Sequence, residues 1–129
     1  MRQTSSKRPT WVRLAAIVAI AFGFLTLFEG GHVLFGPEAV RAAAGHYVPF
    51  VLWFNFLAGF AYVAAGAGLW LWRRWAARLA LAIAAATALV FAAFGVHIAL
   101  GGAFELRTVA AMTLRTVFWL GIALAARRR

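Results

Sequence analysis

Four long apolar runs constrain the fold of this chain more than any other feature. Three contain no Asp, Glu, Lys or Arg and the fourth is interrupted only by Arg115; they are Leu14–Phe28, Val48–Trp72, Leu79–Ala103 and Thr108–Ala126. A helix needs about 20 mostly apolar residues to cross ~30 Å of hydrocarbon. A soluble bundle would carry a polar face of period 3.6 in each run, and these runs carry none. The sequence therefore predicts an all-α, four-transmembrane-helix bundle.

We expect the four spans over 11–34, 48–72, 75–101 and 108–126, within one integral membrane domain of residues 1–129. The connection between the first two spans contains a further element. Gly36-Pro37 reads as a break, Pro37 suits the first position of a helix and Gly45 suits its end. A short helix over 37–44, lying at the outer surface, is the resulting prediction.

The positive charges are distributed unevenly along the chain, which has a net charge of +10. If the spans alternate in direction, ten basic residues share one side without an acid: Arg2, Lys7, Arg8, Arg13, Arg73, Arg74, Arg78, Arg127, Arg128 and Arg129. This is the positive-inside pattern. It predicts a multi-pass protein of a bacterial-type inner membrane with both termini in the cytoplasm. Orientation in the lipid bilayer therefore explains why the chain is basic, and we expect no nucleic-acid partner.

Two further features of the sequence exclude certain chemistries and a cleaved signal peptide. The chain has no cysteine, which excludes disulfide exchange, iron–sulfur clusters and thiolate metal sites. The first apolar run is too long for the h-region of a typical signal peptide, and Ala42-Ala43-Ala44 lies too far downstream to be its cleavage site. We therefore expect this run to stay in the protein as its first span.

Every acid and histidine of the chain maps to the outer third of the predicted bundle. They are Glu29, His32, Glu38, His46, His97 and Glu105. Glu29 and His32 stand three residues apart, which places them on one face of a helix. Intramembrane ionisable residues are candidates for functional sites. The sequence thus predicts an outward-facing polar cluster to which several spans contribute.

Two further polar residues approach this cluster from within the spans. Asn55 lies about 12 Å into the second span on a stripe of small residues (Ala58, Ala61, Ala65 and Gly68), and Arg115 lies at a similar depth in the fourth. An arginine at that depth costs ~2.5 kcal/mol or more in lipid, so it should face the bundle or a hydrated cavity. Glu29 is its expected partner. Alanines at 80, 84, 88 and 92 predict a packing face on the third span.

Four interpretations of the polar cluster remain open at this point. In the first it is a structural network, with Glu29–Arg115 and Glu105–Arg107 ion pairs holding the helices in register. In the second it binds a metal ion through ligands from several helices, as di-metal centres in bundles do, with Asn55 and Arg115 orienting them; the ligands would be Glu29, His32, His97 and Glu105. In the third, His32 and His97 are opposed axial ligands of haem b. In the fourth, Glu29 and its neighbours handle protons or a quinone.

Two functional classes follow from these interpretations. In one, the cluster binds a metal, haem or quinone and the protein serves a redox or transport step. In the other, the protein is an accessory or structural subunit of a larger membrane complex, or a homo-oligomer, with no catalytic site of its own. Whether the chain is an enzyme is left open by the residues alone.

One part of the sequence resembles a known family. Asn55-Phe56-Leu57-Ala58-Gly59-Phe60, then Ala65-Gly66-Ala67-Gly68-Leu69 and Arg73-Arg74-Trp75-Ala76-Ala77, is similar to the second span and inner loop of the DoxX-like small membrane proteins. The resemblance covers about a third of the chain. It implies a four-helix membrane protein of this length, and several members are associated with oxidases or thiol metabolism. This chain has Asn55 where the family often has a glutamate.

Overall fold

The computed structural model describes residues 10–126, and this part of the chain is all-helical. Its helices are α2 (Thr10–Phe35), α3 (Glu38–Ala44), α4 (Pro49–Trp70), α5 (Arg74–Ala99) and α6 (Leu106–Ala126). All except α3 are long and apolar enough to cross a membrane. The ends of these four helices lie within two residues of the spans expected from the sequence. The basic residues of 1–9 and 127–129 lie outside the described range.

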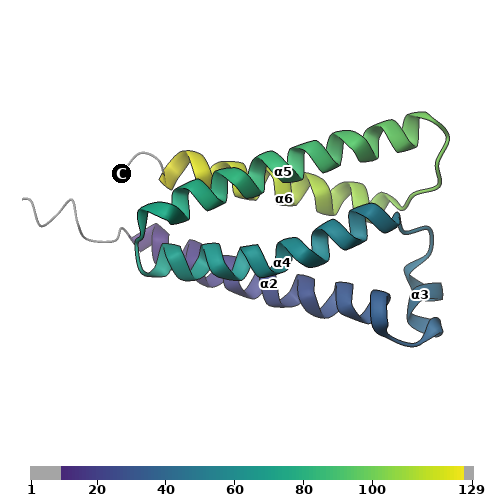
Figure 1. The fold of residues 1–129 in the computed structure, drawn as a ribbon, viewed down its shortest axis with the longest axis horizontal. Coiled ribbons are helices and arrows are strands. Elements are labelled where there is room, and N and C mark those ends of the chain that lie inside the picture. The colour runs from purple at the N-terminus through teal and green to yellow at the C-terminus, as the bar shows by residue number, and fades with distance from the viewer. Residues whose placement is uncertain (1–9, 127–129) are drawn as a thin grey trace, which may run out of the picture.

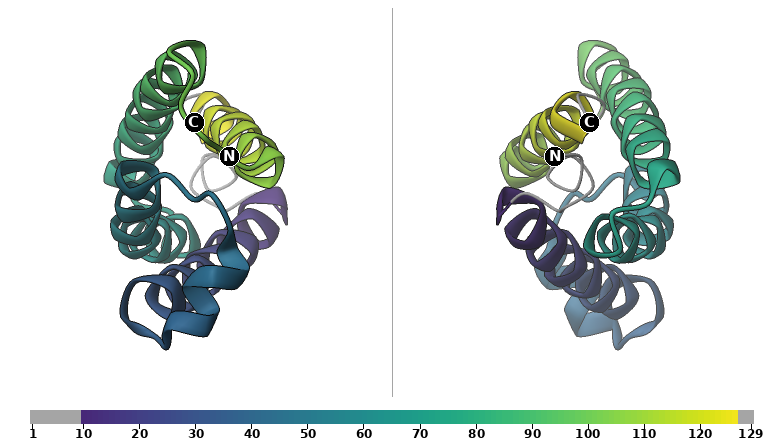
Figure 2. Two further views of the ribbon diagram at one scale, coloured as in Figure 1. Left: turned by 90° about the vertical axis from the view of Figure 1, so that its right-hand side faces the viewer. Right: turned by 90° about the vertical axis from the view of Figure 1, so that its left-hand side faces the viewer.

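The four long helices run side by side along the long axis of the molecule, and α3 lies across one end (Figure 1). We call this the α3 end; it also carries the connection between α5 and α6. The opposite end carries the turn between α4 and α5, the start of α2 and the end of α6. Extensive contacts join α2 to α4, α4 to α5, and α5 to α6. Viewed along the bundle, α6 and α2 are also neighbours, but their backbones lie further apart than those of the other three pairs (Figure 2).

Helices α2 and α4 approach each other at glycines. A Cβ atom on Gly23 would lie 2.8 Å from the Gly59 carbonyl oxygen, and one on Gly66 would lie 3.0 Å from the Ala16 carbonyl oxygen. The small-residue stripe predicted on α4 ends at Gly68, which is covered by the Trp75 ring of α5. Helix α4 therefore packs small residues against both α2 and α5, and the predicted stripe contains only some of these residues.

The predicted alanine face of α5 is correct for only half its length. Ala80 and Ala84 are buried, whereas Ala88 and Ala92 are exposed. A spacing of four residues advances about 40° beyond a full turn at each step, so the third and fourth alanines have rotated off the buried face. Thr87 and Phe94, both fully buried, continue that face instead.

The short helix α3 confirms the prediction made from its flanking residues. Pro37 precedes its first turn in extended conformation, and Gly45 ends it with φ of 74°, a value that favours glycine. Arg41 donates hydrogen bonds from Nη1 to the carbonyl oxygens of Val33 at 3.1 Å and Gly36 at 3.4 Å. These bonds hold α3 against the end of α2.

Candidate functional site

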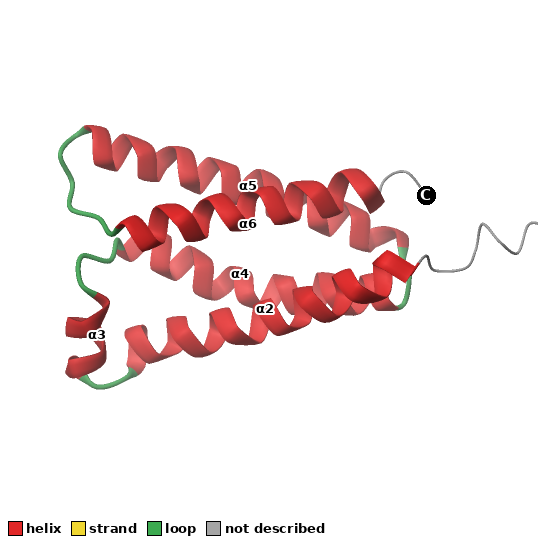
Figure 3. Cartoon of the chain, turned by 180° about the vertical axis from the view of Figure 1, so that it is seen from behind, coloured by secondary structure: helices red, strands yellow, loops and turns green. Residues whose placement is uncertain are grey.

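A pocket of about 510 Å³ lies at the α3 end, between α2, α4 and α6 and beside α3. Figure 3 shows α2 and α6 on one side of the molecule, with α3 across the end where the pocket lies. Its polar lining includes Thr26, Glu29, His32, Asn55, Arg107, Thr108 and Arg115, and its apolar lining includes Phe28, Val33, Val40, Leu52, Phe56 and Ala111. The volume falls within the range of ordinary small-molecule sites.

Arg115 is the most unusual residue of the pocket, because its side chain is charged and only 8% exposed. Its Nη2 donates a hydrogen bond of 3.2 Å to Thr26 Oγ1, and its guanidinium carbon lies 5.1 Å from the centre of the Phe22 ring. Its Nε is buried without a hydrogen-bond partner. The expectation that Arg115 faces the protein interior is confirmed.

The expected Glu29–Arg115 ion pair is wrong. Among the described residues, no acid lies within ion-pair distance of Arg115. Glu29 lines the same pocket but is exposed, one helical turn nearer the α3 end than Thr26. A charged arginine at the centre of a membrane helix costs about 2.5–3.5 kcal/mol. The hydroxyl of Thr26 and the ring of Phe22 contact the guanidinium, and the Tyr62 hydroxyl also interacts with it; all three partners are neutral.

Further polar atoms are buried near this arginine. Asn55 lines the pocket, and its Oδ1 is buried without a hydrogen bond. Deeper in the bundle, the hydroxyl of Tyr62 and the indole nitrogen of Trp119 are also buried without a hydrogen bond of good geometry. Their rings pack with centroids 5.0 Å apart.

Tyr62 and Trp119 were not among the residues predicted from the sequence, although a signal was present. Tyr62 follows Asn55 by seven residues and Trp119 follows Arg115 by four, so each pair shares one face of its helix. These spacings extend a polar line inward from the pocket. Polar tips on otherwise apolar rings are easily missed in an aromatic-rich span.

Glu29 and His32 lie at the exposed edge of the pocket. Both side chains are exposed. His32 Nδ1 lies 3.2 Å from the Phe28 carbonyl oxygen, and the two rings of these residues pack with centroids 4.4 Å apart. The interval of three residues predicted from the sequence therefore does bring Glu29 and His32 to one site.

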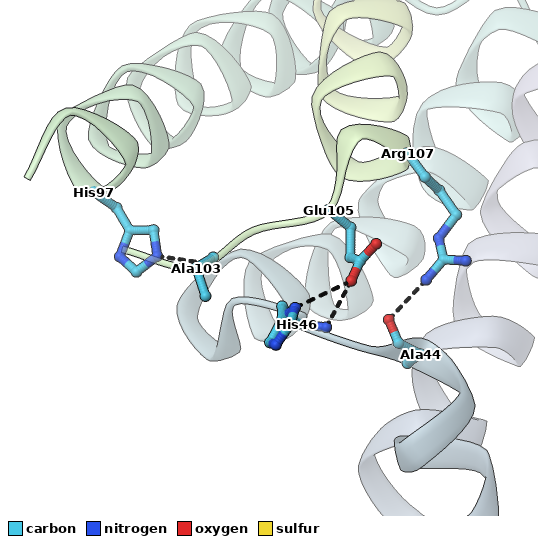
Figure 4. A network of polar contacts seen from close by, with 6 residues as sticks. All are labelled: Ala44, His46, His97, Ala103, Glu105 and Arg107. Atoms are coloured by element: carbon cyan, nitrogen blue, oxygen red, sulfur yellow. Dashed lines mark hydrogen bonds and ion pairs between the residues drawn. The ribbon is translucent and has the colours of Figure 1, made fainter. Parts of the chain in front are cut away.

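His97 serves the connection between α5 and α6 and does not line the pocket. Its Nε2 lies 2.9 Å from the Ala103 carbonyl oxygen (Figure 4). Its ring is stacked on Phe94 with centroids 6.4 Å apart. Of the two histidines predicted as haem ligands, only His32 therefore lines the pocket.

Glu105 and Arg107 do not pair with each other as the sequence led us to expect. Glu105 Oε2 accepts a hydrogen bond of 2.8 Å from the His46 backbone N–H and lies 3.5 Å from His46 Nδ1 (Figure 4). Arg107 Nη2 donates a hydrogen bond of 2.7 Å to the Ala44 carbonyl oxygen. Both side chains thus tie the start of α6 to the end of α3 and the connection that follows it, 59 and 63 residues away in sequence.

The predicted metal ligands are distributed over three places. Glu29 and His32 lie at the pocket edge, His97 at the α5–α6 connection and Glu105 beside His46. Over residues 10–126, no group of three or more His, Cys, Asp or Glu side chains is arranged to hold a metal ion. The four side chains therefore do not fit the metal centre inferred from Glu-x-x-His.

Comparison with known proteins yields no match among protein families, curated proteins or solved structures. The chemistry of the site must therefore be judged from its own groups. Two guanidinium groups, an amide, two threonine hydroxyls, a carboxylate and an imidazole line a pocket whose other residues are largely apolar. Such a combination can hold an apolar molecule by one polar end.

Proposed function

We propose that the protein spans a bacterial-type inner membrane four times, with the α3 end outside. The basis is the asymmetry of charge between the two ends. Among described residues, the α4–α5 end carries four arginines and no acid (Arg13, Arg73, Arg74 and Arg78), whereas the α3 end mixes two arginines with three acids (Arg41, Arg107, Glu29, Glu38 and Glu105). Basic residues near span ends remain in the cytoplasm.

This orientation is tested by cysteine labelling, because the natural chain contains no cysteine. Gly101→Cys lies in the α5–α6 connection and Arg74→Cys at the start of α5. A membrane-impermeant maleimide applied to intact spheroplasts should label the first and spare the second. The reverse pattern would contradict the orientation.

Within that membrane, we propose that the protein binds a small amphipathic molecule in the pocket at the α3 end. The observation that carries this proposal is Arg115, a buried cation with a neutral hydroxyl as its hydrogen-bond partner. A guanidinium has five N–H donors. A ligand with acceptor oxygens would satisfy donors that the protein leaves unused, while the apolar lining takes its hydrocarbon part.

Among the ligand classes raised by the sequence, a quinone is compatible with this pocket. Its carbonyl oxygens accept hydrogen bonds, and its isoprenoid chain is apolar. Metal and haem binding receive no support from the placement of His97 and Glu105. The proposal therefore rests on a membrane-soluble molecule with oxygen acceptors, and not on coordination chemistry.

The experiment fills the pocket and examines what remains bound. Ala111 lines the pocket, whereas its neighbour Ala110 is exposed on the same helix. Wild type, Ala111→Phe and Ala110→Phe would be purified in a mild non-ionic detergent, and bound small molecules identified by mass spectrometry. A compound retained by wild type and Ala110→Phe but lost from Ala111→Phe is expected. Identical contents in all three proteins would overturn the proposal.

A further inference from the structure

We infer that the ligand of this pocket is an anionic amphiphile: one carboxylate, phosphate or sulfonate group on a hydrocarbon chain. This inference rests on the binding function proposed above and names the chemical class of its ligand. It favours an acidic amphiphile over a neutral quinone. The shape of the pocket alone does not distinguish these two ligands.

The charge of the pocket is the first argument. Its lining contains two arginines and one acid, and the acid is the exposed Glu29. Within the described chain, neither arginine forms an ion pair, because Arg107 donates to the Ala44 carbonyl oxygen and Arg115 to a threonine hydroxyl. The buried positive charge is therefore unbalanced. A desolvated cation interacts much more strongly with an anion than a hydrated one does.

The geometry of the arginine is the second argument. A guanidinium presents its donors as a planar fork that matches the oxygens of a carboxylate or phosphate. Thr26 takes one hydrogen bond from Nη2, and Nε is buried with none. Asn55 of α4 and Thr108 of α6 line the same pocket and add donors to it. Oxygens of an anion could therefore be bound from α2, α4 and α6 together.

The apolar lining determines the other half of the ligand. Phe28, Val33 and Phe56 line the pocket beside the polar groups. Phe28, Glu29 and His32 line the pocket and are exposed, so the pocket is open at this edge and a hydrocarbon chain can leave it there toward the surrounding lipid. A free inorganic anion would leave this apolar surface uncovered. The pocket therefore fits a chain-bearing anion better than a small ion.

The test uses delipidated protein in a neutral detergent and probes with matched chains. Hexadecanesulfonate is permanently ionised, hexadecanol is its neutral counterpart, decylubiquinone represents neutral quinones, and inorganic sulfate is an anion without a chain. Native mass spectrometry would report the affinity of each probe. We expect the sulfonate to bind about tenfold or more tightly than hexadecanol, decylubiquinone and sulfate, given the strength of hydrogen bonds to charged groups.

Variants locate that preference on the arginine. Arg115→Gln should reduce sulfonate affinity to the level of hexadecanol and leave hexadecanol unchanged, whereas Arg78→Gln removes an exposed charge at the other end and should change neither. The comparison of probes on wild type is decisive even if Arg115→Gln does not fold. Equal binding of sulfonate and either neutral probe, or of sulfonate and sulfate, would overturn the inference.

The two proposals fail in different ways. If neutral probes bind as tightly as the sulfonate and Ala111→Phe displaces all of them, the pocket binds amphiphiles and only the anionic preference is wrong. If no probe binding responds to Ala111→Phe, the proposed binding function itself is wrong. A sulfonate that binds tightly to wild type and to Ala110→Phe, but not to Ala111→Phe or Arg115→Gln, supports both.

Discussion

Arg115 of α6 donates a hydrogen bond of 3.2 Å to the hydroxyl of Thr26 on α2, and the bond is buried. It joins two neighbouring helices whose backbones lie further apart than those of the other neighbouring pairs. One turn closer to the chain termini, the Phe22 and Phe118 rings meet edge to face at 5.7 Å and close the same boundary. The bond to Thr26 therefore holds the cation at the inner limit of the pocket, where the Tyr62 hydroxyl also interacts with it.

Thr26→Val should destabilise the protein, because it leaves a buried guanidinium without this acceptor. The expected loss is about 1–3 kcal/mol in the free energy of unfolding. Thr113→Val is the matched control, since Thr113 is exposed and its hydroxyl bonds only to the Val109 carbonyl of its own helix. Denaturation in mixed micelles, followed by circular dichroism, measures both. Equal losses would mean that the contact with Arg115 contributes nothing.

Arg115→Met should stabilise the protein in its delipidated, ligand-free form. The substitution keeps an unbranched apolar side chain and removes a buried charge that costs about 2.5–3.5 kcal/mol in a membrane helix. Part of that cost should return as a higher unfolding free energy, on the order of 1–2 kcal/mol. Arg78→Met, at an exposed position, should change stability by less than about 0.5 kcal/mol. A destabilised Arg115→Met protein would show that the charge is fully compensated internally.

Gly23→Ala should weaken the packing of α2 on α4. Its new methyl group would lie 2.8 Å from the Gly59 carbonyl oxygen and 2.7 Å from Val63 Cγ2, so the helices must move apart. Overpacking of this kind costs about 1–3 kcal/mol. Gly121→Ala has no atom within 4 Å of its added carbon and should instead gain up to ~1 kcal/mol from helix propensity. Opposite signs in the same unfolding assay are the expected result.

Gly45→Ala should be more damaging than Gly101→Ala, although both glycines have positive φ, 74° and 88°. Each substitution should cost roughly 1–2 kcal/mol of backbone strain. At Gly101 the added carbon meets open space, but at Gly45 it would collide with the carboxylate of Glu105. The difference between the two losses therefore measures the Glu105 contact. Equal losses would contradict the observed position of that carboxylate.

Glu105→Ala should loosen the connection between α3 and α4. The His46 backbone N–H loses its acceptor at 2.8 Å, so its amide hydrogen should exchange faster with solvent. Glu38→Ala, which removes an exposed acid from α3, should leave this exchange unchanged. Hydrogen–deuterium exchange of the 45–47 segment measures the effect. Unchanged exchange in Glu105→Ala would show that the bond does not hold the connection.

The four long helices and their lengths could be predicted from the apolar runs, because a helix that crosses a membrane must be about as long as the membrane is thick. The burial of Arg115 was likewise predictable from the cost of charge in lipid. Its partner was not. Thr26 and Glu29 share one face of α2, and only the separation and rotation of α2 and α6 decide which of them the guanidinium reaches.

The polar cluster shows the same division. The position of each residue along its span correctly predicted one shared pocket for Glu29, His32, Asn55 and Arg115. Depth does not determine position around the bundle, and for this reason His97 was grouped with residues that it does not join. The loop contacts of Glu105 depend on the path of the α3–α4 connection, for which the sequence supplies only the turn residues.

Helix α2 is continuous from Thr10 to Phe35, so a change in its tilt at one end displaces residues along its whole length. Thr26 lies about 24 Å along the helix axis from Thr10. A change of roughly 10° in tilt about the start of the helix would displace Thr26 by about 4 Å, more than the length of its bond to Arg115. Because tilt responds to hydrophobic thickness, a thicker or thinner bilayer would alter the width of the gap in which that bond forms.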